Sequence, residues 1–101
     1  MEIKNNYEKS RYEILINGEL AGFADYEVIE DTVKFPHTEV DPAFGGRGVG
    51  SALVEFALED VKEQGKFVAP ICPFVAKAIS KKPDQYLSLV PESERAKYGI
   101  A

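Results

Sequence analysis

The chain has 101 residues, 45% of them apolar, which suits a single domain (residues 1–101) with one compact core. Its formal net charge of −5 leaves no broad basic surface and argues against a general nucleic-acid binder. No apolar run approaches the roughly 20 residues that cross a bilayer, and the polar amino terminus does not resemble a signal peptide. A single cysteine, Cys72, excludes a disulfide within the chain. We therefore expect a cytoplasmic protein without a membrane or nucleic-acid partner.

Three strands are predicted in the first forty residues, at residues 12–16, 19–29 and 32–40. Asn17-Gly18 between the first two is a strong hairpin signal, and Glu30-Asp31 suits a second tight turn. Pro36 lies inside the third strand and cannot donate a ladder hydrogen bond. We therefore expect a bulge or a sheet edge at Pro36.

The rest of the chain predicts a helix, a strand, a second helix and a short strand or extended segment, at residues 48–64, 67–71, 74–81 and 86–90. Apolar residues recur at helical spacing in the first helix, and Gly65 ends it. Pro73 suits the first position of the second helix. A right-handed crossover would place the strand at 67–71 parallel to the one at 32–40. The order predicts an α+β domain: an antiparallel three-stranded meander, a crossover helix, a parallel strand, a second helix and a short C-terminal strand.

Three glycines, Gly46, Gly48 and Gly50, follow the third predicted strand, and the first helix begins on them. Glycine lets the backbone approach a ligand, and a helix start offers free N–H groups with a partial positive charge. Such a corner suits a phosphate group. A Walker loop would need lysine where Ser51 stands, and the spacing does not match the dinucleotide fingerprint. The alternative is a turn that only packs the helix onto the sheet.

The pattern resembles the acetyl-CoA loop of the GNAT N-acetyltransferases, Arg/Gln-x-x-Gly-x-Gly/Ala, after a Val-x-Pro turn at residues 40–42. Gly45 occupies the first position, where the family carries Arg or Gln, and Arg47 is a candidate replacement. Four motifs in the family's order are His-Thr-Glu-Val, the glycine loop, Cys-Pro-Phe-Val and Pro-x-x-Tyr, at residues 37–40, 46–50, 72–75 and 83–86. The chain thus resembles a small GNAT-like family with a minimal GNAT fold of α/β type.

This resemblance implies that acetyl-CoA (CoA) is the co-substrate and that no metal is required. The implied cofactor-binding residues are Val40, Gly45, Gly46, Arg47, Gly48, Val49, Gly50 and Ser51. In this family the glycine-loop amides hold the pyrophosphate. The backbone of Val40 would meet the pantetheine arm or the thioester carbonyl, where an amide stabilises the developing oxyanion.

Three side chains are candidate catalytic residues. Cys72 lies at the expected start of a helix, a position that favours thiol reactivity, and it is a candidate nucleophile, a candidate proton donor or a buried structural residue. His37 and Glu39 are candidate bases, since histidine titrates near neutrality and larger GNAT enzymes often carry a glutamate on this strand. Tyr86 is a further candidate donor, although a core tyrosine is the simpler interpretation.

The resemblance predicts an enzyme, an acyltransferase that moves an acetyl group from acetyl-CoA to an unidentified amine. This enzyme would belong to the acyltransferases that transfer groups other than amino-acyl groups. The alternative is a non-catalytic module that binds CoA or acyl-CoA. We expect a monomer or a weak homodimer, because a small open sheet exposes an edge strand.

Overall fold

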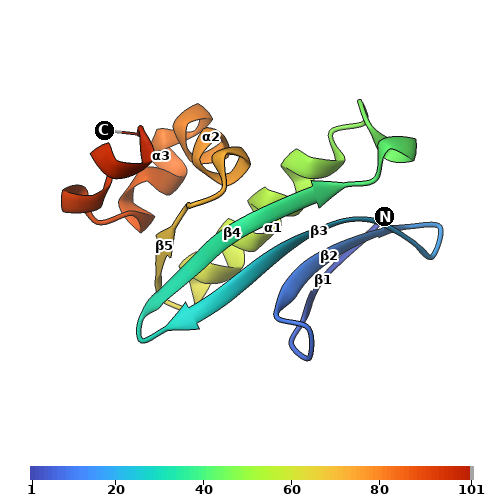
Figure 1. Ribbon diagram of the computed structural model, residues 1–101, viewed down its shortest axis with the longest axis horizontal. Coiled ribbons are helices and arrows are strands. Elements are labelled where there is room, and N and C mark those ends of the chain that lie inside the picture. The colour runs from blue at the N-terminus through green and yellow to red at the C-terminus, as the bar shows by residue number, and fades with distance from the viewer. Residues whose placement is uncertain (101) are drawn as a thin grey trace.

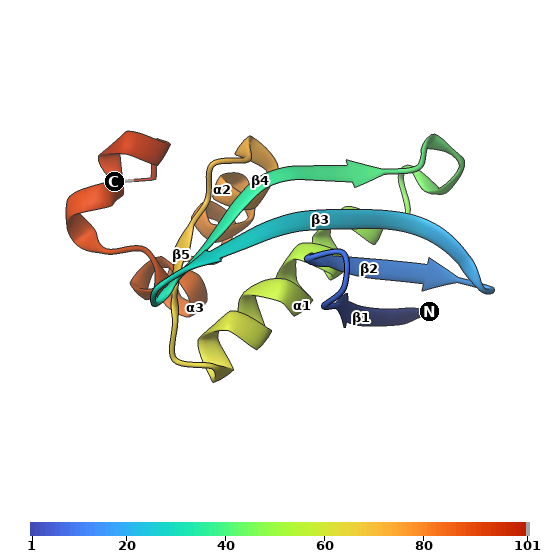
Figure 2. The same cartoon turned by 60° about the horizontal axis from the view of Figure 1, so that its bottom comes forward.

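The computed structural model describes residues 1–100 and contains one five-stranded sheet with the order β1-β2-β3-β4-β5 (Figures 1 and 2). The strands are β1 (Glu2–Asn6), β2 (Arg11–Ile16), β3 (Glu19–Ile29), β4 (Thr32–Val40) and β5 (Phe67–Ala69). Neighbouring strands from β1 to β4 are antiparallel, and β5 is parallel to β4. The predicted meander and the parallel strand are therefore confirmed.

The helical elements are η1 (Pro42–Phe44), α1 (Val49–Glu63), α2 (Pro73–Lys81), α3 (Pro83–Tyr86), η2 (Leu87–Leu89), η3 (Glu92–Glu94) and η4 (Ala96–Tyr98). Both predicted helices are present at the expected places. Within residues 1–100, no helix is long and apolar enough to cross a membrane.

Two features differ from the sequence prediction. The structure adds β1, which pairs with β2 at the edge of the sheet. The prediction of a short C-terminal strand at residues 86–90 is wrong, because this segment continues from α3 into the 3-10 turn η2. Pro83 occupies the first turn of α3, where its fixed φ favours a helix, so it starts a new helical turn after α2.

The hairpin and the bulge were both predicted. Asn17 and Gly18 adopt positive φ angles of 52° and 79°, as a two-residue hairpin turn requires. The β3–β4 register shifts where residues 35 and 36 of β4 oppose a single residue of β3. This bulge lies at Pro36, and it sets which side chains of β4 face α1 further along the strand.

The core lies between α1 and one face of the sheet. Helix α1 contacts β2, β3 and β4, and it buries the apolar side chains Val49, Leu53, Val54, Ala57, Leu58 and Val61. The large buried side chains of the sheet are Tyr12, Ile14, Phe35 and Val68. No helix covers the opposite face of β2, β3 and β4 in the part of the chain that the structure describes (Figure 2). We call this the open face of the sheet.

Candidate functional site

The glycine corner joins the end of β4 to the start of α1. Asp41 Oδ1 accepts the N–H of Ala43 at 2.9 Å and so caps η1. Gly46 and Gly48 then take φ angles of +78° and +70°, in the left-handed region that favours glycine. Gly48 is the N-cap of α1 and no side chain caps this helix, so the first N–H groups of α1 are available to a ligand. All eight predicted cofactor-binding residues lie at this corner: Val40, Gly45, Gly46, Arg47, Gly48, Val49, Gly50 and Ser51.

Gly50 has a packing role that the sequence did not reveal. A Cβ atom at this position would lie 2.5 Å from Cζ of Phe74 and 3.2 Å from Cγ2 of Val40. The first turn of α1 therefore packs closely against both the end of β4 and the first turn of α2.

Strand β4 parts from β5 before it reaches the corner. Their pairing covers only Thr32–Lys34 with Phe67–Ala69. The last link is the N–H of Cys72, which donates to the carbonyl of Phe35 at 2.8 Å, and the chain then turns into α2 (Figure 1). Residues 36–40 of β4 continue without a strand beside them on that edge. The edge of β4 from residue 36 to 40 is therefore unpaired on that side, and the glycine corner follows at its end.

The structure brings His37 and Glu39 together. Both side chains lie on the open face and are more than half exposed, with Nε2 of His37 3.9 Å from Oε2 of Glu39. The His37 ring also meets the Phe23 ring edge-on, at 6.0 Å between centroids. This pair is accessible to an amine and to water.

Cys72 lies on the other side of β4. It is the N-cap residue of α2 and is buried, and its Sγ–H donates to Oγ1 of Thr38 at 3.5 Å. Thr38 lies between His37 and Glu39 in sequence, so its side chain projects to the opposite face of the strand. The three candidate catalytic residues therefore do not form one cluster.

Tyr86 is a core residue. It is 1% exposed, and its hydroxyl donates to Oε2 of Glu59 at 2.9 Å. Burial, followed by this hydrogen bond to a carboxylate, raises the pKa of Tyr86 to about 12. Its side chain joins α3 to α1, which supports the structural interpretation.

A group of lysines beside the corner was missed from the sequence. A cleft of about 260 Å³ between α1 and α2 is lined by Ser51, Glu55, Phe74, Lys77, Ala78, Lys81 and Lys82. Lys82 pairs with Glu55 at 2.9 Å, and this is the only ion pair that the described residues form with these lysines. Lys77 and Lys81 are four residues apart and so share a face of α2. That spacing is visible in the sequence, but only the fold places it next to Ser51.

Residues 11–89 match the model of the GCN5-related N-acetyl-transferase family. The chain belongs to this family. The GNAT resemblance and the mixed GNAT sheet are thereby confirmed, and the family is one of acyltransferases.

Several known proteins are similar to this GNAT chain. Protein NATD1 of Xenopus tropicalis is 28% identical over 90 residues, which cover 86% of this chain and 83% of that protein. The solution structure of a GCN5-like protein from Staphylococcus aureus aligns with a TM-score of 0.64 and 25% identity, over 89% of this chain and 87% of the other. The ribosomal-protein-S18-alanine N-acetyltransferase of Escherichia coli aligns with a TM-score of 0.56 and 27% identity. That alignment covers 57% of this chain and only 38% of the enzyme.

Proposed function

We propose that the protein is an acetyl-CoA-dependent N-acetyltransferase that acetylates an amine. The observation that carries this proposal is the glycine corner, whose uncapped α1 amides follow the edge of β4 that has no pairing with β5. Amides at a helix start bind phosphate oxygens well. The unpaired edge of β4 offers its backbone groups to an extended ligand arm.

The lysine cleft supports the same ligand. CoA carries several phosphate groups, and the overall charge of the chain is −5, so a local cationic group is informative. Lys77 and Lys81 line a cleft that also contains Ser51 of the glycine corner. Phosphates bound at the α1 amides would thus have ammonium groups beside them.

The residues around this edge of β4 suit the transfer reaction. Acetyl-CoA supplies the acetyl group and a sulfur leaving group. On the open face, the His37–Glu39 pair takes the proton of the attacking amine as the C–N bond forms, directly or through water. The N–H of Val40 is the proposed donor to the carbonyl oxygen. As the C–S bond breaks, the buried Cys72 thiol gives its proton to the departing sulfur, and exchange with water restores both groups.

A non-catalytic CoA-binding module remains the second candidate. The observation that favours it is the separation of the candidate residues, with His37 and Glu39 largely exposed and Cys72 buried behind the strand. A binding module needs the corner and the cleft but not this pair.

Calorimetric titration with acetyl-CoA and with CoA tests the ligand, and thiol release over a panel of amines tests the activity. We expect binding of both compounds and amine-dependent thiol release. If neither compound binds, both candidates are wrong. Binding without release for any amine would select the binding module.

A further inference from the structure

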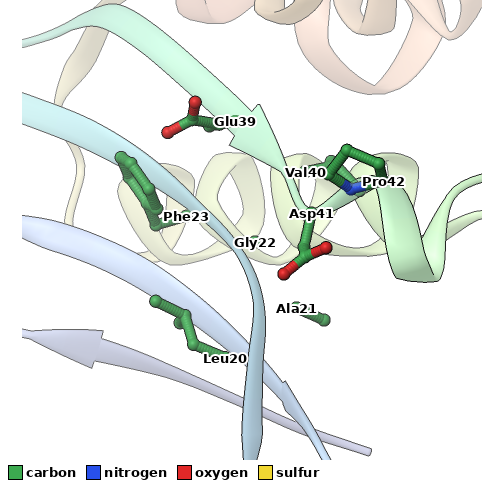
Figure 3. Close-up of a pocket in the computed structure, with 8 residues that line it drawn as sticks. All are labelled: Leu20, Ala21, Gly22, Phe23, Glu39, Val40, Asp41 and Pro42. Atoms are coloured by element: carbon green, nitrogen blue, oxygen red, sulfur yellow. The ribbon is translucent and has the colours of Figure 1, made fainter.

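A cavity of about 350 Å³ lies where β3 begins and β4 ends (Figure 3). It is lined by Leu20, Ala21, Gly22, Phe23, Glu39, Val40, Asp41 and Pro42. The β2–β3 register shifts by one residue at this point, and the N–H of Asp41 donates to the carbonyl of Ala21 at 2.8 Å. The cavity therefore begins beside Val40 and Glu39, which belong to the site of the proposed function.

The lining combines apolar groups with carboxylates. Leu20 and Phe23 come from β3, Glu39 lies beside Phe23 on β4, and Asp41 lies apart from them where β4 ends (Figure 3). No lysine, arginine or histidine lines it. Asp41 uses Oδ1 for the cap of η1, and its second carboxylate oxygen has no hydrogen bond to any of the described residues. This lining suits a ligand with a cationic end and an aliphatic body.

Phe23 is fixed in place by its neighbours. The guanidinium of Arg11 lies 4.6 Å from the centroid of the Phe23 ring, and His37 meets the same ring edge-on. Nε of Arg11 donates to Oε2 of the buried Glu13 at 2.7 Å. The charge of Arg11 is thus neutralised locally, so it does not oppose a cation near Phe23.

The cavity contains two carboxylates at separate positions. Glu39 and Asp41 are two residues apart at the end of β4, and alternate residues of a strand lie about 7 Å apart on one face. An ammonium bound tightly to a carboxylate is a poor nucleophile. With two separate carboxylates, one amine of a ligand can stay bound to Asp41 as an ammonium group. A second amine of the same ligand can then lose its proton to the His37–Glu39 pair.

We propose that this cavity binds the acceptor and that the acceptor is a short aliphatic diamine. This inference rests on the proposed function. The distal ammonium binds the free oxygen of Asp41, the methylene groups lie on Leu20 and Phe23, and the reacting amine lies at Glu39. A monoamine leaves Asp41 without a partner and binds less tightly.

The test is an amide-shift NMR titration of the full chain with 1,4-diaminobutane, n-butylamine and phenethylamine, without acetyl-CoA. We expect shifts at residues 20–23 and 39–41, and an affinity for the diamine about tenfold above that for n-butylamine, as one added charged hydrogen bond provides. Asp41→Asn keeps the helix cap, since asparagine is an equally good N-cap residue, but it removes the charge. This variant should bind the diamine no better than n-butylamine.

Asp84→Asn is the matched control, because Asp84 is an exposed carboxylate in the first turn of α3, outside the cavity. It should leave diamine affinity unchanged. Equal affinities for the diamine and n-butylamine, shifts elsewhere, or an unaltered Asp41→Asn variant would each overturn the proposal. Tighter binding of phenethylamine would also overturn it and assign the cavity to an aromatic monoamine.

Failure of the two proposals can be told apart. A protein that binds the diamine in this cavity but releases no thiol from acetyl-CoA keeps the cavity assignment and loses the enzymatic one. A protein that acetylates amines without preference for the diamine keeps the activity and loses the cavity assignment.

Discussion

Cys72 and Thr38 meet on the side of β4 that faces α1, with 3.5 Å between Sγ and Oγ1. His37 and Glu39, the residues on either side of Thr38, project to the open face. The two groups proposed to move protons are therefore separated by the strand itself. In the proposed reaction, one proton leaves the amine on the open face and another reaches the leaving sulfur from the buried side.

Replacement of the thiol tests the second of these steps. Cys72→Ala should lower kcat by about 10²-fold, the usual contribution of a general acid, because the sulfur would leave unprotonated. Thiol release at saturating acetyl-CoA measures it, and the KM for acetyl-CoA should change little. Thr38→Val is the matched control, since it removes the hydrogen bond to Cys72 but leaves the thiol in place. An unaltered kcat in Cys72→Ala would remove the cysteine from the mechanism.

Loss of the carboxylate on the open face tests the first step. Glu39→Gln keeps the shape of the side chain but cannot accept a proton, so kcat/KM should fall by about 10²-fold at pH 7. The deficit should shrink as the pH approaches 10, where a growing fraction of an alkylamine is already unprotonated. Glu27→Gln, an exposed position on β3 away from the corner, should leave the pH profile unchanged. A deficit that stays constant with pH would contradict the role of Glu39 as a base.

The glycine corner can be tested with a pair of matched variants. Gly48 and Gly65 have φ angles of +70° and +72°, and a Cβ at either position would meet no atom within 4 Å. Alanine at each should therefore cost about 1–2 kcal/mol in unfolding free energy, measured by urea titration, because both place a side chain in the left-handed region. Only Gly48→Ala alters the amides at the start of α1, so only it should weaken CoA binding, by about tenfold. Equal CoA affinities in the two variants would argue that the corner is only structural.

Most of the fold could be predicted from the sequence, because its signals are local. Apolar periodicity identified α1, and the pairs Asn17-Gly18 and Cys72-Pro73 located a hairpin and the start of α2. Strand β1 was missed because Ile3 is the only apolar residue in its five positions. The segment 86–90 was misassigned because a short apolar run does not distinguish a strand from a helical turn.

The site was less predictable, because it depends on contacts between distant segments. Strand alternation predicts that His37 and Glu39 share a face, but which face they share depends on the register of the bulge at Pro36. The distance from Cys72 to Thr38 depends on how far β5 follows β4. The position of Lys77 and Lys81 beside Ser51 depends on the packing of α2 against α1.

The lysine cleft predicts a salt-dependent contribution to CoA affinity. Lys77→Gln and Lys81→Gln should each weaken CoA binding by up to about fivefold, the usual strength of an exposed ion pair. The loss should diminish at high ionic strength, since salt screens exposed charges. Lys66→Gln, beyond the C-terminal end of α1, removes a partly exposed lysine outside the cleft and should have no effect. Calorimetry at low and at high salt measures the CoA affinity of each variant and its dependence on salt. If Lys77→Gln and Lys81→Gln lose no more affinity than Lys66→Gln, the cleft is not part of the CoA site.

The raised pKa of Tyr86 predicts that the protein loses stability in alkaline solution. Burial and the hydrogen bond to Glu59 raise its pKa to about 12 in the folded protein, whereas an unfolded tyrosine titrates near 10. Between these values the folded state holds a proton that the unfolded state releases, so the unfolding free energy falls as the pH rises from 10 to 12. Tyr86→Phe should cost about 1 kcal/mol at pH 7 through the lost hydrogen bond, and its stability should fall less steeply above pH 10.

In Tyr86→Phe, the fall of the unfolding free energy above pH 10 should become less steep but should not disappear. A second buried tyrosine acts in the same direction. Burial, and then the hydrogen bond to Asp60 at 2.6 Å, also raise the pKa of Tyr12. Tyr7→Phe is the control, since Tyr7 is 75% exposed, and it should keep the wild-type dependence on pH. Urea unfolding midpoints at pH 8, 10 and 11 compare the three proteins. Parallel curves for Tyr86→Phe and the wild type would mean that Tyr86 does not hold its proton more tightly in the folded state.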